Sequence, residues 1–440
     1  MTDTSTSILS PDARTKKRNA AEGRFKLYGM AAIGVGLAML ILLVVTIVGN
    51  GMGAFQQTFV TLNVELLESK LDKKGERNID DIKKVSTFGY SPLLKNALGA
   101  AVEENGIETT LKTKDQVKLL SKSAAADLRN YVLADPDQIG KTIEFTFLAN
   151  SRVDGYLKGR VTRESIANDK NINAAQLDLV DALKDAGVIK KRFNADFFLG
   201  ADASDQRPEA AGMGVAMAGS FFMMLVVLAL SLPIGVAASI YLEEFAPKNW
   251  LTDIIEVNIS NLAAVPSIVF GILGLAVFIN YMHLPQSAPL VGGLVLTLMT
   301  LPTIIISTRA SLKSVPPSIR DAALGIGASK MQAVFHHVLP LAAPGILTGT
   351  IIGLAQALGE TAPLLLIGMI GFIASNAPGS IAEGLMSPNS AMPAQIYEWA
   401  KRADPAFYER AWGGIIILLV FLITMNTIAV ILRRRFERRW

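Results

Sequence analysis

Six stretches of this chain, two of them separated only by Glu360, run for 22 residues or more without a charged side chain, which is incompatible with an ordinary soluble fold. Hydrophobic residues make up 51% of the 440 positions and charged residues only 18%, a balance typical of a chain with several membrane spans. The longest stretch, 257–308, is long enough for two spans and contains a proline-rich turn at 283–289. The sequence therefore predicts six transmembrane helices, at 27–49, 210–242, 257–282, 290–308, 331–359 with a continuation to 382, and 411–432.

Basic side chains gather beside the first and the last apolar stretch, and positive charge stays on the cytoplasmic side of a membrane. Both ends are therefore predicted to be cytoplasmic, and the formal net charge of +4 indicates orientation rather than nucleic-acid binding. An uncleaved anchor is favoured over a signal peptide, since a long polar leader precedes it and no clear cleavage site follows. A re-entrant segment in place of one span would put the two ends on opposite sides. The flanking residues are Arg14, Lys16, Lys17, Arg18, Arg24 and Lys26, then Arg433, Arg434, Arg435, Arg438 and Arg439.

A polar stretch of mixed charge separates the first two predicted spans. It contains a helical pattern at Gln176–Ala186 and a strand-like piece at Thr142–Leu148, so we expect a soluble insert that is helical or α+β. The predicted organisation is a cytoplasmic tail at 1–26, a span at 27–49, a periplasmic insert at 50–209, a membrane core at 210–432 and a basic tail at 433–440.

Few side chains are available for bond chemistry. The chain has no cysteine and three histidines, which excludes disulfides and thiolate sites and argues against a histidine metal cage. His336 and His337 are adjacent and would point about 100° apart on a helix, so we expect surface roles for them. No phosphate-binding G-x4-G-K-[ST] motif occurs. Tyr397, Trp399 and Trp412 are interpreted as an aromatic belt at the membrane surface rather than a binding cage.

The polar loop 312–340 carries two helix-start signals around a small-residue corner. Ser318 stands three residues before Asp321, and Ser329 three before Gln332, the spacing of a capping box. Gly327 can end the first helix in the left-handed conformation. The sequence therefore predicts two short helices that meet near Gly327.

The spacing D-A-A-x3-G-x11-L-P in this loop resembles the EAA loop of ABC importer permeases. Asp321 replaces the usual Glu, and His337 stands where an apolar residue is usual. The helices of the EAA loop sit in a groove of a separate ATPase subunit, so the resemblance implies a coupling loop formed by Ser318, Asp321, Ala322, Ala323, Gly327, Leu339 and Pro340.

Glu360 is the most costly residue to place in a membrane, with 29 uncharged residues before it and 22 after it. A carboxylate at such depth costs about 3 kcal/mol on insertion scales, so it is expected to face a cavity or a partner rather than lipid. Small and polar neighbours, Gln356 to Pro363, suit a translocation path or a subunit interface. The alternative is a packing carboxylate that pairs with an Arg of a neighbouring helix.

The segment A-L-G-E-T-A-P-L-L-L around Glu360 closely resembles the PstA-type permease of the phosphate ABC importer. Pro233–Glu244, Asn261–Gly271 and Thr300–Ile305 agree with that family, and the resemblance covers about 210–432. Many relatives carry Arg where this chain has Gln356 and Ile306, while Arg309 lies one helical turn beyond Ile306. The residues assigned to the path or a subunit interface are Glu360, Gln356, Thr361 and Arg309.

The resemblance implies an all-α membrane core of the type I ABC importer permease kind, in a bacterial inner membrane. It implies a phosphate transport subunit that is not an enzyme and binds no cofactor itself, with ATP and Mg on the partner ATPase. The implied partners are a PstC-type second permease, a PstB-type ATPase dimer, a PstS-type phosphate-binding protein, phosphate and membrane lipid. A permease for another oxyanion or another solute, for example sulfate or molybdate, is one alternative. A membrane sensor is another, but it would need a cytoplasmic output domain, and only eight residues follow Leu432.

Overall fold

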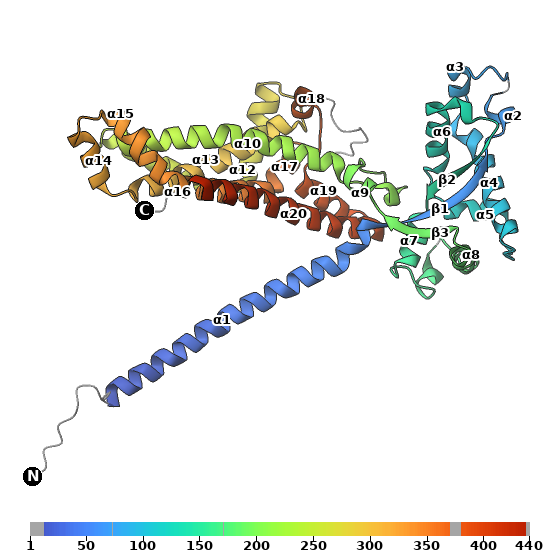
Figure 1. Ribbon diagram of the computed structural model, residues 1–440, viewed down its shortest axis with the longest axis horizontal. Coiled ribbons are helices and arrows are strands. Elements are labelled where there is room, and N and C mark those ends of the chain that lie inside the picture. The colour runs from blue at the N-terminus through green and yellow to red at the C-terminus, as the bar shows by residue number, and fades with distance from the viewer. Residues whose placement is uncertain (1–12, 73, 170, 370–379, 437–440) are drawn as a thin grey trace, which may run out of the picture. The chain divides into compact units, whose positions relative to one another are not determined.

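The computed structural model describes residues 13–436 except 73, 170 and 370–379 (Figure 1). Two compact units result, residues 1–50 and residues 51–440. The first is formed by α1 (Ala13–Gly51), a continuous helix of 39 residues that contains the predicted span 27–49. About 20 apolar residues suffice to cross a bilayer, so α1 is long enough to do so and to extend beyond the membrane. The predicted basic residues Arg438 and Arg439 lie outside the described residues.

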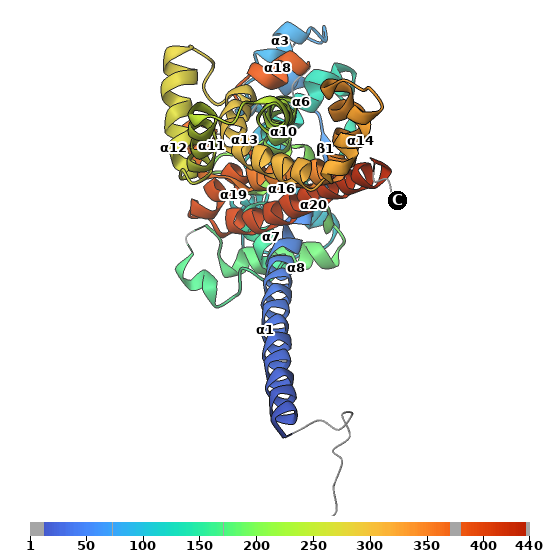
Figure 2. The same cartoon turned by 90° about the vertical axis from the view of Figure 1, so that its left-hand side faces the viewer.

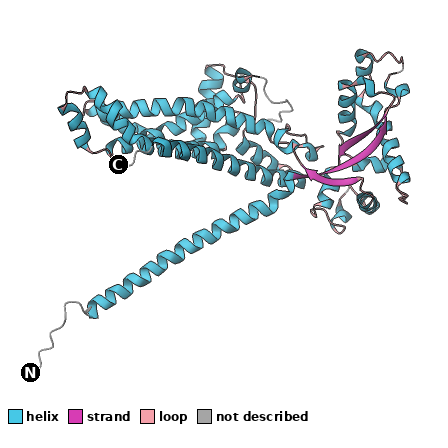
Figure 3. Ribbon diagram, in the orientation of Figure 1, coloured by secondary structure: helices cyan, strands magenta, loops and turns pink. Residues whose placement is uncertain are grey.

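The insert is built on a three-stranded antiparallel sheet with the order β2-β1-β3 (Figure 3). The central strand β1 (Gln56–Glu65) pairs with β2 (Thr142–Leu148) and with β3 (Ile189–Phe193). Val60, Leu62 and Val64 alternate into the domain core, as period-2 strand geometry requires. The predicted strand at 142–148 is confirmed, and the predicted helix at 176–186 is α8 (Ala174–Asp185).

Helices cover this sheet and give the insert a core of its own. The longest, α4 (Thr87–Glu104), packs against β1 and α6 (Ala124–Ala134). Fully buried side chains such as Tyr90, Leu98 and Leu128 fill the space between them, each stabilising the fold by about 1.5–3 kcal/mol. The remaining elements are η1 (Met52–Phe55), α2 (Glu68–Leu71), α3 (Ile79–Lys83), α5 (Thr113–Gln116), η2 (Val117–Leu119), η3 (Pro136–Gln138), α7 (Ser151–Leu157), η4 (Ser165–Asn168), α9 (Asp196–Leu199) and η5 (Pro208–Ala210).

The membrane core is helical throughout the described residues, and α13 is its centre. In the end-on view of Figure 2, α13 lies beside α10 and α16, against both of which it packs. Glycines allow the close approach to α16: a Cβ at Gly345 or Gly349 would lie 2.3 or 2.0 Å from a serine hydroxyl of α13. The elements are α10 (Gly214–Ile240), η6 (Tyr241–Phe245), α11 (Trp250–Ala263), α12 (Ser267–Leu273), η7 (Gly274–Tyr281), α13 (Pro289–Lys313), α14 (Pro317–Gly325), α15 (Lys330–Gln332), η8 (Ala333–Val338), α16 (Leu339–Gly359), α17 (Ala362–Leu366), α18 (Ile381–Met386), α19 (Met392–Lys401) and α20 (Pro405–Phe436).

Within the described residues, five helices are long and apolar enough to cross a membrane. A sixth span exists only if α11 and the α12–η7 segment count as one, because they meet at an angle of 103°. The predicted helix at 257–282 is therefore broken in the structure rather than continuous. Pro266 explains the break, since it lacks an N–H and disfavours helical geometry in the residue before it. The predicted continuation of 331–359 to 382 also breaks, at Glu360, and partly falls on 370–379, outside the described residues.

Candidate functional site

The loop that follows α13 starts its first helix two residues earlier than predicted. α14 begins at Pro317 with Pro316 as its N-cap, and no side chain caps it. The predicted Ser318–Asp321 capping box is therefore wrong. Proline is favoured at the first helical position because its fixed φ suits the helix and its missing N–H would have had no partner there. Ser318 and Asp321 are both exposed.

Gly327 ends α14 as predicted, in the left-handed conformation with φ +93°. The N–H of Ala328 donates to the carbonyl of Ala323, and the N–H of Gly327 donates to the carbonyl of Leu324, both at 3.0 Å. This pair of bonds is a Schellman motif, which stops a helix sharply. Ala323 is buried beneath it, whereas Ala322 is exposed.

The second helix begins with the predicted capping box. Gln332 N–H donates to Ser329 Oγ (3.2 Å), and Ser329 N–H donates to Gln332 Oε1 (2.8 Å). α15, η8 and α16 then follow one another, with Leu339 and Pro340 half-buried where α16 starts. The corner between the two short helices is thus fixed by local bonds on both sides.

Arg320 anchors this loop to the membrane core, a role that sequence reasoning missed. Its Nη2 donates to Glu244 Oε1 (2.7 Å) and to the Leu312 carbonyl (2.9 Å), while its Nη1 donates to the Val315 carbonyl (2.8 Å). Glu244 belongs to η6 at the end of α10, and its side chain is only 7% exposed. One guanidinium therefore ties α14 to α10 and to the end of α13. No local pattern reveals a pair 76 positions apart.

The outer face of the loop carries uncovered apolar side chains beside Asp321. Leu324 is 46% exposed, Ile326 84%, Met331 59% and Phe335 43%. Met331 and Phe335 also border an apolar groove of about 580 Å³ between α10 and η8. We call these four residues the loop patch. His336 and His337 are exposed as expected, and the described residues contain no group of side chains able to hold a metal ion.

Glu360 lies where the helix breaks in the middle of an apolar stretch. α16 ends at Gly359 and α17 starts at Ala362, so Glu360 and Thr361 form the linker. Glu360 is half-buried, and Gln356, one turn before it, is exposed. No ion pair or side-chain hydrogen bond joins the Glu360 carboxylate to another described residue. The structure thus brings Gln356, Glu360 and Thr361 together and leaves them partly uncovered.

Arg309 is engaged inside the chain. Its Nη2 lies 2.5 Å from Glu256 Oε1, and its Nε lies 3.3 Å from Glu243 Oε2. Its side chain is 16% exposed, whereas Ile306 is 46% exposed. The structure does not bring Arg309 to Glu360, and its predicted role toward the path or an interface stays a prediction.

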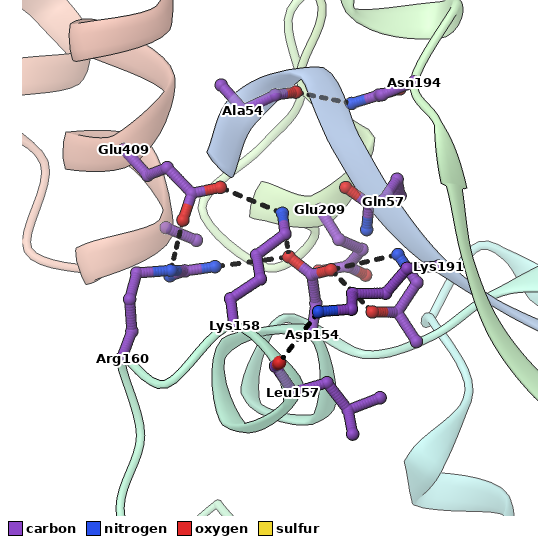
Figure 4. A network of polar contacts seen from close by, with 12 residues as sticks. Ala54, Gln57, Asp154, Leu157, Lys158, Arg160, Lys191, Asn194, Glu209 and Glu409 are labelled. Carbon is purple, nitrogen blue, oxygen red and sulfur yellow. Dashed lines mark hydrogen bonds and ion pairs between the residues drawn. The ribbon is translucent and has the colours of Figure 1, made fainter. Parts of the chain in front are cut away.

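A buried polar junction joins the insert to α20, and nothing in the sequence singled it out. Asp154 Oδ1 accepts bonds from the N–H and the hydroxyl of Thr58 (3.0 and 2.8 Å). Lys158 lies 2.6 Å from Asp154 and 2.9 Å from Glu409, the carboxylate that α20 contributes. Figure 4 shows Arg160 on the other side of Glu409, against its second oxygen. We call Asp154, Lys158, Arg160, Glu409 and Arg410 the junction.

Arg410 extends the junction toward the chain that leads into α10. It is 2% exposed and donates to Gln57 Oε1 (2.5 Å), to the Glu209 carbonyl (2.9 Å) and to the Ala54 carbonyl (3.2 Å). The Glu209 carboxyl accepts a bond from the hydroxyl of Ser121, and burial raises its pKa above the usual value of 4.5. Gln57 and Thr58, at the start of β1, are fully buried here, but their polarity alone does not distinguish them from exposed strand residues.

Trp399 is not part of a membrane-surface belt. It is fully buried, its indole N–H donates to Asp202 Oδ1 (2.8 Å), and its ring stacks on Phe197. The prediction is wrong for this residue because α19 packs against α20, and Asp202 satisfies the only polar atom of the buried indole side chain.

In comparisons with known proteins, two family models match separate parts of the chain. Residues 231–440 match the family described as binding-protein-dependent transport system inner membrane component, and residues 12–167 match a domain of unknown function, DUF3333. The phosphate transport system permease protein PstA of Yersinia pestis is 31% identical over 224 residues, which are 50% of this chain and 73% of that protein. PstA 1 of Mycobacterium tuberculosis strain CDC 1551 is 29% identical over 231 residues, which are 52% of this chain and 73% of that protein. A solved structure of the MetNI methionine ABC transporter aligns with a TM-score of 0.37 at 16% identity, over 52% of this chain and 95% of that one.

Proposed function

Because this chain belongs to the family of binding-protein-dependent transport inner membrane components, and within it to the PstA-type permeases, we propose that it carries phosphate through an ATP-driven importer. The chain is a multi-pass subunit of an ABC importer, and transport subunits of this kind are not enzymes. Phosphate as the solute, the loop as the coupling element and the cytoplasmic position of both ends are parts of the proposal.

The observation that carries the proposal is a loop held firmly on the inside and uncovered on the outside. Arg320, the Schellman motif at Gly327 and the Ser329 capping box fix its shape. The loop patch and Asp321 remain exposed in this chain. Exposed apolar groups on a rigid element are typical of a docking surface. The partner that we propose is an ATPase dimer of the PstB type, which binds ATP and Mg and moves the loop between two states.

Glu360 is proposed to face the second permease subunit, of the PstC type. A carboxylate in the path itself would repel phosphate, which is an anion. A cation of the partner would instead neutralise Glu360 and offset its desolvation. Gln356 and Thr361 lie on the same uncovered segment and complete the proposed interface.

The insert is proposed to lie outside the cytoplasmic membrane, where a phosphate-binding protein of the PstS type delivers its ligand. The basic residues before α1's apolar part and at the end of α20 support this orientation, since positive charge favours the cytoplasmic side. The loop 312–340 is then cytoplasmic, as docking to an ATPase requires.

Uptake of radioactive phosphate tests the proposal. Membrane vesicles from cells with and without this chain, supplied with binding protein and internal ATP, should differ in phosphate accumulation and not in sulfate or molybdate accumulation. Chain-dependent uptake of sulfate or molybdate in place of phosphate would establish the alternative oxyanion permease and overturn the phosphate proposal.

A further inference from the structure

The insert is attached to the membrane core at more places than its chain connections require. It is continuous with the core at its carboxyl end, through α9 and η5, and at its amino end η1 packs against α20. A domain held by two adjacent connections can still pivot on them. The junction adds a third attachment on α20, where the contact between Lys158 and Glu409 joins residues 251 positions apart.

The side chains of this third attachment are shielded from solvent, and their ion pairs form in only one arrangement of the two elements. The side chains of Asp154, Lys158 and Glu409 are 4–6% exposed. Removing charges from water costs nearly as much as their attraction returns, so buried ion pairs contribute little net stability. They do penalise any displacement that separates them, because each charge would then be buried without a partner. A network of this kind holds one orientation.

α20 connects the junction to the parts of the core that are proposed to move. It packs along α16, where Arg433 Nη1 donates to Thr348 Oγ1 at 3.1 Å. α16 continues from the loop 312–340 and ends at Gly359, directly before Glu360. The contacts therefore run without interruption from the loop through α16 and α20 to the insert.

We propose that the insert is a rigid arm of α20, which keeps its position on α20 through the transport cycle and is carried by it. This inference rests on the proposed function, because it takes the loop to be driven by an ATPase. It gives the insert a role: an extracytoplasmic surface that changes place in step with the loop. Such a surface suits a partner that is gripped and released once per cycle, namely a substrate-binding protein.

This chain contains no cysteine, so two introduced cysteines are the only sites in it that a thiol-reactive spin label can modify. Lys184→Cys on α8 and Tyr408→Cys on α20 are both exposed and lie outside the junction. Pulsed electron resonance on the assembled complex then measures the insert-to-α20 distance, at rest and after trapping with ATP and vanadate. The rigid arm predicts one narrow distribution with the same mean in both states. A mean that shifts on trapping would overturn the proposal without any destabilising variant.

Glu409→Gln removes the charge that α20 contributes and keeps the shape of the side chain. We expect it to broaden the distribution and lower phosphate uptake severalfold, while the ATPase still co-purifies. The matched control is Asp178→Asn, the same acid-to-amide change in an exposed ion pair with Arg163 inside the insert, which should change neither readout.

Narrow distributions in both Glu409→Gln and Glu409→Ala would show that the junction does not hold the insert, and normal uptake despite broadening would remove its role in transport. Absence of uptake in the unmodified complex would instead contradict the proposed function. The comparison of distributions can then be made on the purified chain, which keeps the two failures apart.

Discussion

The loop 312–340 and the junction are both polar, but they find their partners in different places. The junction satisfies its charges within the chain, and the side chains of Asp154, Lys158 and Glu409 are only 4–6% exposed. The loop leaves Asp321 and four large apolar side chains uncovered. Buried, satisfied groups are expected to determine stability, and uncovered groups on a rigid element are expected to determine assembly and transport. Substitutions should therefore separate the two regions by readout.

The largest expected effect is on stability, at the junction. Lys158→Met leaves the carboxylates of Asp154 and Glu409 with Arg160 as their shared ion-pair partner among the described residues. Removing one member of a buried ionic network typically costs about 3–5 kcal/mol. We expect a clearly lower midpoint of thermal unfolding. The same substitution at Lys118, which is 60% exposed and paired with Asp115, should leave the free energy of unfolding within about 0.5 kcal/mol of the unmodified protein and the midpoint nearly unchanged. Equal midpoints for the two variants would contradict the account.

Glu360→Gln should show the opposite behaviour. The carboxylate has no ion pair to another described residue, so thermal stability should not fall. Loss of the charge that we propose to pair with the second permease should lower phosphate uptake by about tenfold or more. Phosphate uptake and co-purification of the second permease, measured on the same variant, test this prediction. Unchanged uptake would show that the Glu360 carboxylate is dispensable for transport.

Arg320 combines features of both regions. It belongs to the loop, and its half-buried side chain is paired with Glu244 inside the chain. Arg320→Glu places two carboxylates together, and we expect uptake to fall by about fivefold to tenfold because α14 loses its anchor. The exchange Arg320→Glu with Glu244→Arg should restore part of the activity. Lys313→Gln, on an exposed lysine nearby, serves as the control. An exchange no better than the single variant would argue against the anchor.

The smallest expected effect is the pH dependence of Glu209. Burial raises its pKa in the folded state, so the neutral carboxyl is favoured by folding. The stability that the carboxyl contributes is complete below pH 4.5 and is lost as the pH rises through the folded pKa. The midpoint of thermal unfolding of Glu209→Gln should therefore equal that of the unmodified protein near pH 4 and lie slightly above it at pH 8. A variant that is less stable at pH 8 would show that the charged form is the one that folding favours.

The sequence predicted those features that depend on neighbouring residues. Gly327 and the Ser329–Gln332 capping box needed only local backbone geometry, and β2 needed only its alternating pattern. The break at Pro266 was missed because hydropathy measures length and not direction. Ser318 does not cap α14, because Pro316 and Pro317 already place the start of the helix before it. The Arg320 anchor and the contacts of Glu409 and Arg410 with the insert join residues 76 to 356 positions apart, and no single-sequence pattern encodes such pairs.

The central claim, that the loop transmits an ATPase cycle, is tested most directly at Gly327. A Cβ there meets no atom within 4 Å in this chain, so only the positive φ penalises a side chain, by about 1 kcal/mol. ATP hydrolysis stimulated by loaded binding protein should fall moderately in Gly327→Ala and stay normal in Gly325→Ala, where space is also open and φ is not positive. Gly327→Asp should show no stimulation and no co-purifying ATPase, whereas normal stimulation with a normal amount of ATPase would contradict the account.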